Sequence, residues 1–193
     1  LNEKEALLRE VHHRVKNNMA TIESLLSLQV GSTAHAEVKT ALQDTITRVQ
    51  SSRVLYDKLL VSDNLKEVSI GPYANGLVDA VAGVFDLENT ITIERRIADF
   101  GMTPKKAFFL GIIINELLTN VFKYAFKSRD GGNVSVSIEK EERTVTLTIQ
   151  DNGVGFDERT LKNETSGFGL TVIQMLVEQS GGTYSLSNDN GAR

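Results

Sequence analysis

The first 62 residues contain no proline and a single glycine, Gly31. Apolar or small residues recur on both sides of that glycine at alternating spacings of three and four: Leu8, Val11, Val15, Ile22 and Leu25 before it, and Val38, Leu42, Val49, Tyr56 and Leu59 after it. This spacing is typical of a coiled-coil-like seam. Because Gly31-Ser-Thr predicts a turn between the two runs, we expect a helical hairpin.

Each helix of such a hairpin carries one apolar stripe, so part of the seam would stay in water. Pairing two hairpins into a four-helix bundle would cover it. We therefore expect a homodimer formed through the N-terminal hairpin.

The pattern changes from Ser69 onward. We expect a helix over 72–85, a strand over 90–97, a long helix over 104–126, strands over 134–138 and 145–149, a helix over 169–180 and a short strand over 183–187. Pro104 suits the first turn of a helix, and the two period-two strands predict a hairpin around Glu141-Glu-Arg. This order predicts an α/β sandwich with helices on one face of a mixed sheet.

The whole chain is therefore expected to be an α+β protein of two domains, a hairpin over 1–64 and an α/β domain over 65–193. The net charge of −4 does not favour nucleic acid as a partner. The absence of cysteine excludes disulfides, thiolate metal sites and thiol nucleophiles. No uninterrupted apolar run approaches the roughly 18 residues of a membrane span. We expect a cytoplasmic location, with any anchor in segments upstream of Leu1.

The long predicted helix carries a second, polar face. Four residues of different chemistry follow one another at positions i, i+4, i+7 and i+8: Glu116, Asn120, Lys123 and Tyr124. On a regular α-helix these positions share one side. A carboxylate, an amide, an ammonium group and an aromatic ring are what a magnesium–triphosphate ligand with a planar base requires. A solvated polar stripe explains the same four residues equally well.

Two glycine-rich segments follow. Asp151-Asn-Gly-Val-Gly comes directly off a predicted strand, so Asp151 could accept a hydrogen bond from an exocyclic amine while its glycines pass close to a base. Gly167-Phe-Gly-Leu opens a predicted helix, whose free N–H groups suit a phosphate. Taken alone, each segment is better explained by a tight turn.

The order of these three segments resembles the asparagine box and the two glycine boxes of the GHKL ATP-binding fold, which histidine kinases share with gyrase-type ATPases. The resemblance implies ATP and Mg²⁺ as ligands. It implies that Asn120 binds Mg²⁺, that Lys123 contacts phosphate and that Tyr124 lies against the adenine.

The same resemblance gives roles to the glycine-rich segments. It implies that Asp151 holds the adenine amine and that Gly153 and Gly155 line the base. Residues 156–166 would form an ATP lid, and one more strand would follow Arg193 in this fold. The residues implied to close over the phosphates are Gly167, Gly169 and Leu170.

Two adjacent histidines, His12 and His13, lie on the first predicted helix in the segment Glu10-Val-His-His-Arg-Val-Lys-Asn-Asn. Adjacent helical residues point about 100° apart, so the two cannot share a face. On its own the segment is most simply a pair of surface histidines. Together with the ATP-binding segments it resembles the second type of histidine-kinase dimerisation and phosphoacceptor domain.

That resemblance implies that His13 is the phosphoacceptor, since a neutral imidazole nitrogen is a competent nucleophile. Arg14 stands where an acidic residue usually follows the acceptor. Glu10, one turn earlier, is therefore the candidate base that orients the imidazole. The third histidine, His35, falls near the predicted turn and is most simply a surface residue.

The resemblance to a sensor histidine kinase core implies a protein-histidine kinase. It would phosphorylate itself on His13 with ATP and then pass the phosphoryl group to an aspartate of a response-regulator receiver domain, under the control of a sensor domain upstream of this chain. Two alternatives stay open. One is a GHKL-fold ATPase, because Glu116 occupies the place of a water-activating glutamate in gyrase-like members. The other is a catalytically inactive ATP-binding or interaction module.

Overall fold

The computed structural model describes residues 2–60, 67–85, 91–127, 129, 131–161 and 167–193. The chain divides into two compact units, Leu1–Asp63 and Asn64–Arg193. Each unit is described by itself.

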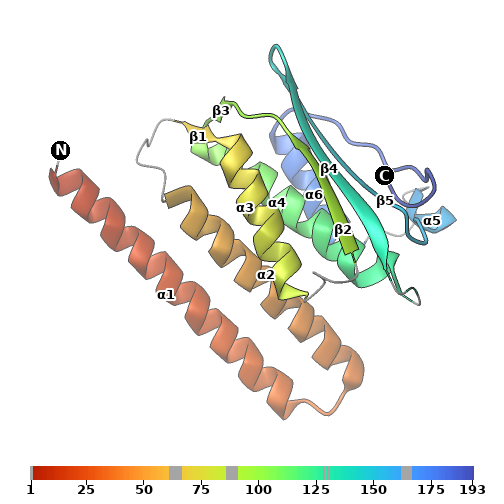
Figure 1. The fold of residues 1–193 in the computed structure, drawn as a ribbon. Coiled ribbons are helices and arrows are strands. Elements are labelled where there is room, and N and C mark those ends of the chain that lie inside the picture. Colours follow the sequence, from red (N-terminus) through yellow and green to blue (C-terminus); the bar gives the residue numbers. More distant parts are fainter. Residues whose placement is uncertain (1, 61–66, 86–90, 128, 130, 162–166) are drawn as a thin grey trace. The chain divides into compact units, whose positions relative to one another are not determined.

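The first unit is the predicted helical hairpin (Figure 1). Helix α1 spans Asn2–Ser32, and helix α2 spans Ala36–Leu60 and packs along it. The turn comes later than expected: Gly31 lies inside α1, because Thr33 N still donates to Gln29 O at 3.1 Å. Helix α2 begins after His35, whose carbonyl accepts a hydrogen bond from Lys39 N at 3.0 Å.

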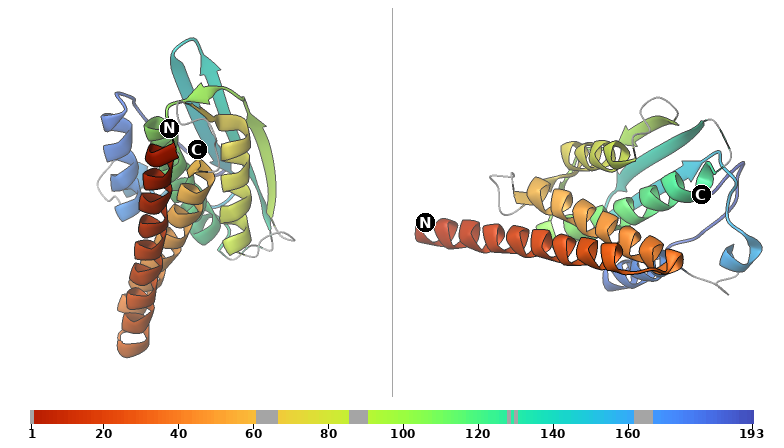
Figure 2. Two further views of the ribbon diagram at one scale, coloured as in Figure 1. Left: turned by 90° about the vertical axis from the view of Figure 1, so that its left-hand side faces the viewer. Right: turned by 90° about the horizontal axis from the view of Figure 1, so that it is seen from below.

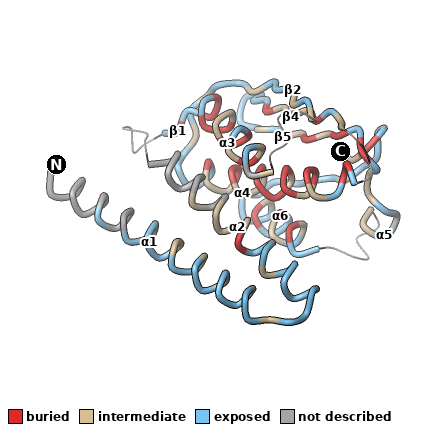
Figure 3. Tube along the Cα trace, turned by 60° about the horizontal axis from the view of Figure 1, so that its bottom comes forward, coloured by how far each residue is buried: buried red, intermediate tan, exposed pale blue. Residues whose placement is uncertain are grey.

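The seam of the hairpin is only partly covered. An ion pair joins the two helices, with Arg53 Nη1 3.0 Å from Glu23 Oε2. Large apolar side chains elsewhere on the hairpin are exposed, as the pale blue stretches in Figure 3 indicate: Ile22, Leu25, Leu28 and Val38. Four further residues of the predicted seam have side chains outside the described part: Leu8, Val11, Tyr56 and Leu59.

The second unit is built on a mixed three-stranded sheet, as predicted. Strand β4 (Gly132–Glu141) lies in the centre, parallel to β2 (Ile91–Ile97) and antiparallel to β5 (Thr144–Asp151). Its alternate residues Val134, Val136 and Ile138 are buried, whereas their neighbours are not. This alternation gives the sheet one apolar face for the helices.

Helices cover that face (Figures 1 and 2). Helix α3 spans Ile70–Val84 and packs on β2 and on α4, which spans Pro104–Asn120. Helix α6 (Phe168–Gln179) packs on the other side of α4. The fully buried side chains of the core therefore come from α3, α4 and the sheet, and the largest include Ile70, Leu77, Ile114, Leu118 and Ile138.

Three small elements complete the second unit. Strands β1 (Val68–Ser69) and β3 (Gly101–Met102) form an antiparallel pair, which was not predicted because two residues are too few to show alternation. Helix α5 spans Glu158–Leu161. A π-helical turn, η1, spans Val121–Ala125 and continues α4, where the sequence predicted a regular helix.

The predicted strand over 183–187 is wrong. These residues belong to no strand, and the only bridge in the described residues after α6 joins Asn188 to Ala192. A strand requires a ladder with a neighbouring strand, and residues 183–186 pair with none of the described strands. Ser187 exchanges two backbone hydrogen bonds with Arg193, at 2.8 Å each, and these close a turn over 187–193.

By length and mean hydropathy, one helix among the described residues could cross a membrane, Pro104–Ala125. Half of its most apolar window is buried within the structure, and it carries the buried polar residues Asn115, Glu116 and Thr119. These are properties of the central helix of a folded domain. Its apolar run, Phe108 to Ile114, is the longest in the sequence, but no span was predicted there because Gly111 interrupts the run and Asn115 and Glu116 follow it.

Candidate functional site

The polar residues of α4 and η1 lie at different depths. Glu116 is 4% exposed, Asn120 and Lys123 are half-buried, and Tyr124 is 49% exposed. A π-turn places fewer degrees of rotation between successive residues than an α-helix does. Glu116 and Asn120, both in α4, therefore share one face as predicted. Lys123 and Tyr124 lie in the π-turn, so their alignment with that face differs from the prediction.

Lys127 was missed by the sequence reasoning. Its Nζ lies 5.0 Å from the centroid of the Tyr124 ring, within the range of a cation–π interaction. An ammonium group resting on a half-exposed ring limits the directions in which that ring can turn. The ring that was expected to lie against a base is thus held from one side.

Asp151 is buried at the end of β5, 3% exposed. Its Oδ1 accepts hydrogen bonds from Gly153 N at 2.7 Å and from Ala192 N at 3.2 Å. Oδ2 accepts no hydrogen bond from the described residues. The carboxylate is therefore oriented by two backbone donors through one oxygen, and the other oxygen can accept a bond from a ligand.

The loop after Asp151 is joined to the end of η1. Val154 N donates to Ala125 O at 3.0 Å, and a β-carbon at Gly153 would collide with the same carbonyl oxygen. Only glycine allows this close approach. The structure thereby brings together two segments that the sequence analysis singled out separately, the polar end of the long helix and the first glycine-rich loop.

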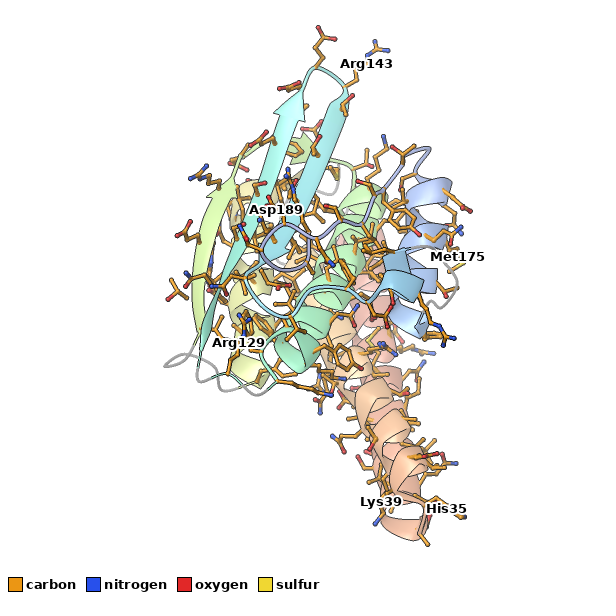
Figure 4. All side chains as sticks on the ribbon, turned by 90° about the vertical axis from the view of Figure 1, so that its right-hand side faces the viewer. His35, Lys39, Arg129, Arg143, Met175 and Asp189 are labelled. Carbon is orange, nitrogen blue, oxygen red and sulfur yellow. The ribbon has the colours of Figure 1, made fainter. Side chains whose placement is uncertain are left out.

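Side chains next to this junction add three further links. Arg129 Nη1 donates to Asn152 O, and Asn133 N donates to Asn152 Oδ1 at 2.8 Å. Arg129 is labelled in Figure 4 near the C-terminal end of the long helix. Asn188 contributes the third link, to Phe156. Asn188 is a common turn residue by type, and no spacing in the sequence marks the contacts of Asn188 or Arg129.

The second glycine-rich segment begins α6. Gly167 is the N-cap residue with an extended backbone, φ −68° and ψ 162°, and no side chain caps the helix. Gly169 is buried, Leu170 is half-buried and Phe168 is 68% exposed. The N-cap residue of this twelve-residue helix thus contributes no side-chain hydrogen bond, and the N-terminal end of a helix is where backbone N–H groups can bind an anion.

The segment between the two glycine-rich stretches is described only in part. Asp157 Oδ1 accepts a hydrogen bond from Thr160 N at 2.6 Å, and this bond lowers the pKa of Asp157. Asp157 therefore caps the short helix α5. Residues 162–166, the remainder of the expected lid, lie outside the described part.

His13 lies in α1, and its side chain is outside the described part of the structure. Glu10, the candidate base, is described. Both hydrogen bonds from Arg14, from Nε at 3.2 Å and from Nη2 at 2.6 Å, go to Glu10 Oε1. Because both side chains are well exposed, this ion pair adds little stability to the fold. Both bonds use Glu10 Oε1, so Oε2 is the oxygen of Glu10 that could face another group.

Two family models match the chain, one to each part. The model described as "Histidine kinase" matches residues 10–85, and the model described as "Histidine kinase-, DNA gyrase B-, and HSP90-like ATPase" matches residues 105–193. The chain belongs to the histidine kinase family. The first match covers the helix with His13, and the second covers every residue of the candidate nucleotide site.

Individual histidine kinases show the same relationship. Sensor histidine kinase PdtaS of Mycobacterium tuberculosis is 30% identical over 176 residues, which are 90% of this chain and 35% of PdtaS. Blue-light-activated histidine kinase 2 of Erythrobacter litoralis is 25% identical over 186 residues, 93% of this chain and 53% of that protein. The chain thus spans between a third and about half of the length of these relatives.

A solved histidine kinase domain has the same fold. The domain from a blue-light-activated histidine kinase of Erythrobacter litoralis superposes with a TM-score of 0.68 at 22% identity, over 100% of this chain and 92% of that one. The predicted fold class, a helical hairpin followed by a GHKL α/β domain, is confirmed.

Proposed function

We propose that this histidine kinase core binds ATP with Mg²⁺ and transfers the γ-phosphoryl group to its own His13. The observation that carries the proposal is the arrangement of Asp151, a buried carboxylate whose Oδ1 is bound to two backbone N–H groups while Oδ2 can accept a further bond. An exocyclic amine of adenine supplies the matching donor. A charge-assisted bond of this kind in a buried site is strong and directional.

The donor set near the polar end of the long helix fits Mg²⁺. The family implies ATP binding, and Asn120, with Glu116 one turn before it, offers oxygen ligands. Among the residues described here, no group of three or more His, Cys, Asp or Glu side chains could hold a metal ion alone. A magnesium–nucleotide site fits this, since Mg²⁺ is held by one or two protein oxygens together with the phosphates. When bound, Mg²⁺ would neutralise charge on the phosphates.

The phosphates would lie between Lys123 and the start of α6. Lys123 supplies a positive charge, and the backbone N–H groups at the N-terminal end of α6 supply hydrogen-bond donors. A transferring phosphoryl group needs positioning and charge neutralisation more than covalent help from the protein. These residues would provide both.

The transfer step balances with groups of this chain. The lone pair of one imidazole nitrogen of His13 attacks the γ-phosphorus, a P–N bond forms, and the bond to the β–γ bridging oxygen breaks to release ADP. The ring then gives up the proton of its other nitrogen. Glu10 is proposed as the carboxylate that orients the ring and takes up this proton. A second step would pass the phosphoryl group to an aspartate carboxylate of a response-regulator receiver domain.

The homodimer is part of the same proposal. Ile22, Leu25 and Leu28 are 47%, 58% and 70% exposed on α1. Several exposed aliphatic side chains on one helix favour association with another apolar surface. We propose that a second copy of the hairpin covers them and that a four-helix bundle results.

One experiment separates this function from a GHKL ATPase and from an inactive module. The chain is incubated with γ-labelled ATP and Mg²⁺, and the label retained on protein is tested in acid and in base. A histidine kinase gives label that is lost in acid and stable in base. Free labelled phosphate without labelled protein would indicate an ATPase, and nucleotide binding without either product would indicate an inactive module.

A further inference from the structure

The C-terminal turn over 187–193 is a defined structure. Asp189 N donates to Gly191 O at 2.9 Å inside the turn, and Gly191 has a φ of 147° that favours glycine. Together with the two bonds between Ser187 and Arg193, this holds the turn in one conformation. Figure 4 labels Asp189 on this turn.

The turn is bonded to the loop that follows β5. Asp151 N donates to Ala192 O at 2.9 Å, and Ala192 N donates to Asp151 Oδ1 at 3.2 Å. Gln150 Nε2 donates to Asp189 O at 3.1 Å. The turn therefore holds the beginning of the loop, at the residue proposed to recognise the base.

Asn188 holds the other end of the same loop. Its Oδ1 accepts a hydrogen bond from Phe156 N at 2.8 Å, and its Nδ2 donates to Phe156 O at 2.9 Å. One side-chain amide thus satisfies both backbone groups of Phe156, as a neighbouring strand would. The carboxamide of asparagine offers a donor NH₂ and an acceptor oxygen side by side, which matches the N–H and C=O of one residue.

Without the hydrogen bonds to Asp151 and Phe156, the loop between these two residues would have wide conformational freedom. It contains Gly153 and Gly155, and Gly155 adopts a φ of +75° that favours glycine. A β-carbon on Gly155 would lie 2.8 Å from Asn188 Oδ1. The amide of Asn188 therefore packs directly against the second glycine of the segment that was expected to line the base.

We propose that Asn188 is a positioning residue for nucleobase recognition. It fixes Gly155 and Phe156 while Ala192 fixes Asp151 Oδ1, so that Asp151 Oδ2 keeps its direction toward an exocyclic amine. This inference rests on the proposed function and adds to it a residue outside the three ATP-binding segments. Its consequence is specificity: the turn favours 6-aminopurine nucleotides over 6-oxopurine nucleotides.

The test compares ADP with inosine diphosphate, which carries a carbonyl oxygen in place of the amine and undergoes no phosphoryl transfer. Asn188→Asp has nearly the same shape and keeps the acceptor for Phe156 N, but it places an oxygen against Phe156 O. We expect the preference for ADP over inosine diphosphate to fall by roughly two- to tenfold, while the affinity for inosine diphosphate changes little. Isothermal titration calorimetry measures both affinities.

The matched control is Asn190→Asp, which adds the same charge two residues along the turn, where no described side-chain bond to Phe156 exists. It should keep the preference of the unmutated chain. If Asn188→Asp does not fold, as judged by circular dichroism, Asn188→Ala carries the same test without added charge.

The outcomes separate the two proposals. An unchanged preference in a folded Asn188 variant, or an equal loss for both nucleotides, would overturn the positioning role and leave the kinase proposal intact. An unmutated chain that binds neither nucleotide would contradict the proposed function itself, and the positioning role with it.

Discussion

The two oxygens of Asp151 have different surroundings. Oδ1 is bound to Gly153 N and Ala192 N, and Oδ2 accepts no hydrogen bond from the described residues. An asparagine here would keep its oxygen at the Oδ1 position, because both backbone groups are donors. Its NH₂ group would then take the Oδ2 position and meet an adenine amine donor to donor.

Asp151→Asn should therefore weaken ADP binding while the fold is kept. Loss of a charged hydrogen bond costs about 1.5–3 kcal/mol, or roughly 10- to 150-fold in affinity. Calorimetric titration with ADP measures this, and Asn120→Asp is the control. That variant should chiefly disturb the magnesium dependence and block autophosphorylation. Unchanged affinity for ADP in Asp151→Asn would count against the assignment of the base site.

The sequence could give the types and order of these residues but not their links. Asp151, Gly153 and Asn120 were predicted because a carboxylate, a close-approach glycine and an amide each leave a local signal. Asn188, Arg129 and Lys127 act through partners that are distant in the chain or through the direction of a side chain. Nothing local in the sequence records such partners.

Among the elements, the longest ones were predicted most accurately. The hairpin, the sheet and the helices α4 and α6 have strong periodicity, and their ends were correct to within a few residues. The π-turn after Asn120 was missed, because one wider turn leaves the spacing of apolar residues nearly unchanged. The prediction of a strand over 183–187 was wrong. Alternation indicates only that a segment can pair, whereas a strand also requires a neighbouring strand to pair with.

The beginning of α3 depends on a residue from another segment. Asp99 Oδ1 accepts hydrogen bonds from Ser69 Oγ at 2.6 Å and from Gly71 N at 2.9 Å. The bond from Ser69, with a smaller contribution from Gly71, lowers the pKa of Asp99. Because the folded-state pKa is below the unfolded value, the ionised carboxylate stabilises the fold above the unfolded pKa, and this stability is lost as the pH falls.

Asp99→Asn should make thermal unfolding less sensitive to acid. The unmutated chain should lose melting temperature more steeply than the variant as the pH falls through about 4, where ordinary aspartates titrate. Asn keeps an oxygen acceptor for Ser69 and Gly71, so α3 should still form. Circular dichroism across this pH range measures the difference, and parallel curves for the two proteins would contradict it.

In the proposed dimer, the exposed apolar side chains of the hairpin form the contact between the two copies. Ile22→Glu removes little packing within one chain, since Ile22 is 47% exposed. Burying an aliphatic side chain contributes about 1.5–3 kcal/mol. A homodimer carries the change in both copies, and each copy should raise the dissociation constant of the dimer at least tenfold.

Light scattering at micromolar concentration checks this prediction. Ser27→Glu is the matched control, because Ser27 is exposed and lies about 140° around the same helix from Ile22. It should leave the dimer intact. A stable monomer of the unmutated chain would contradict the proposed dimer. Equal dissociation of the dimer by both variants would contradict the assignment of the contact surface to Ile22 and its neighbours.

The central claim is that His13 receives the phosphoryl group of ATP. The most direct measurement maps the phosphorylated residue by mass spectrometry under neutral or basic conditions, after incubation of the chain with ATP and Mg²⁺. We expect phosphate on His13, its loss in His13→Gln with nucleotide affinity close to unchanged, and its retention in His12→Gln. Phosphate found on His12 or His35, or labelling that persists in His13→Gln, would contradict the account.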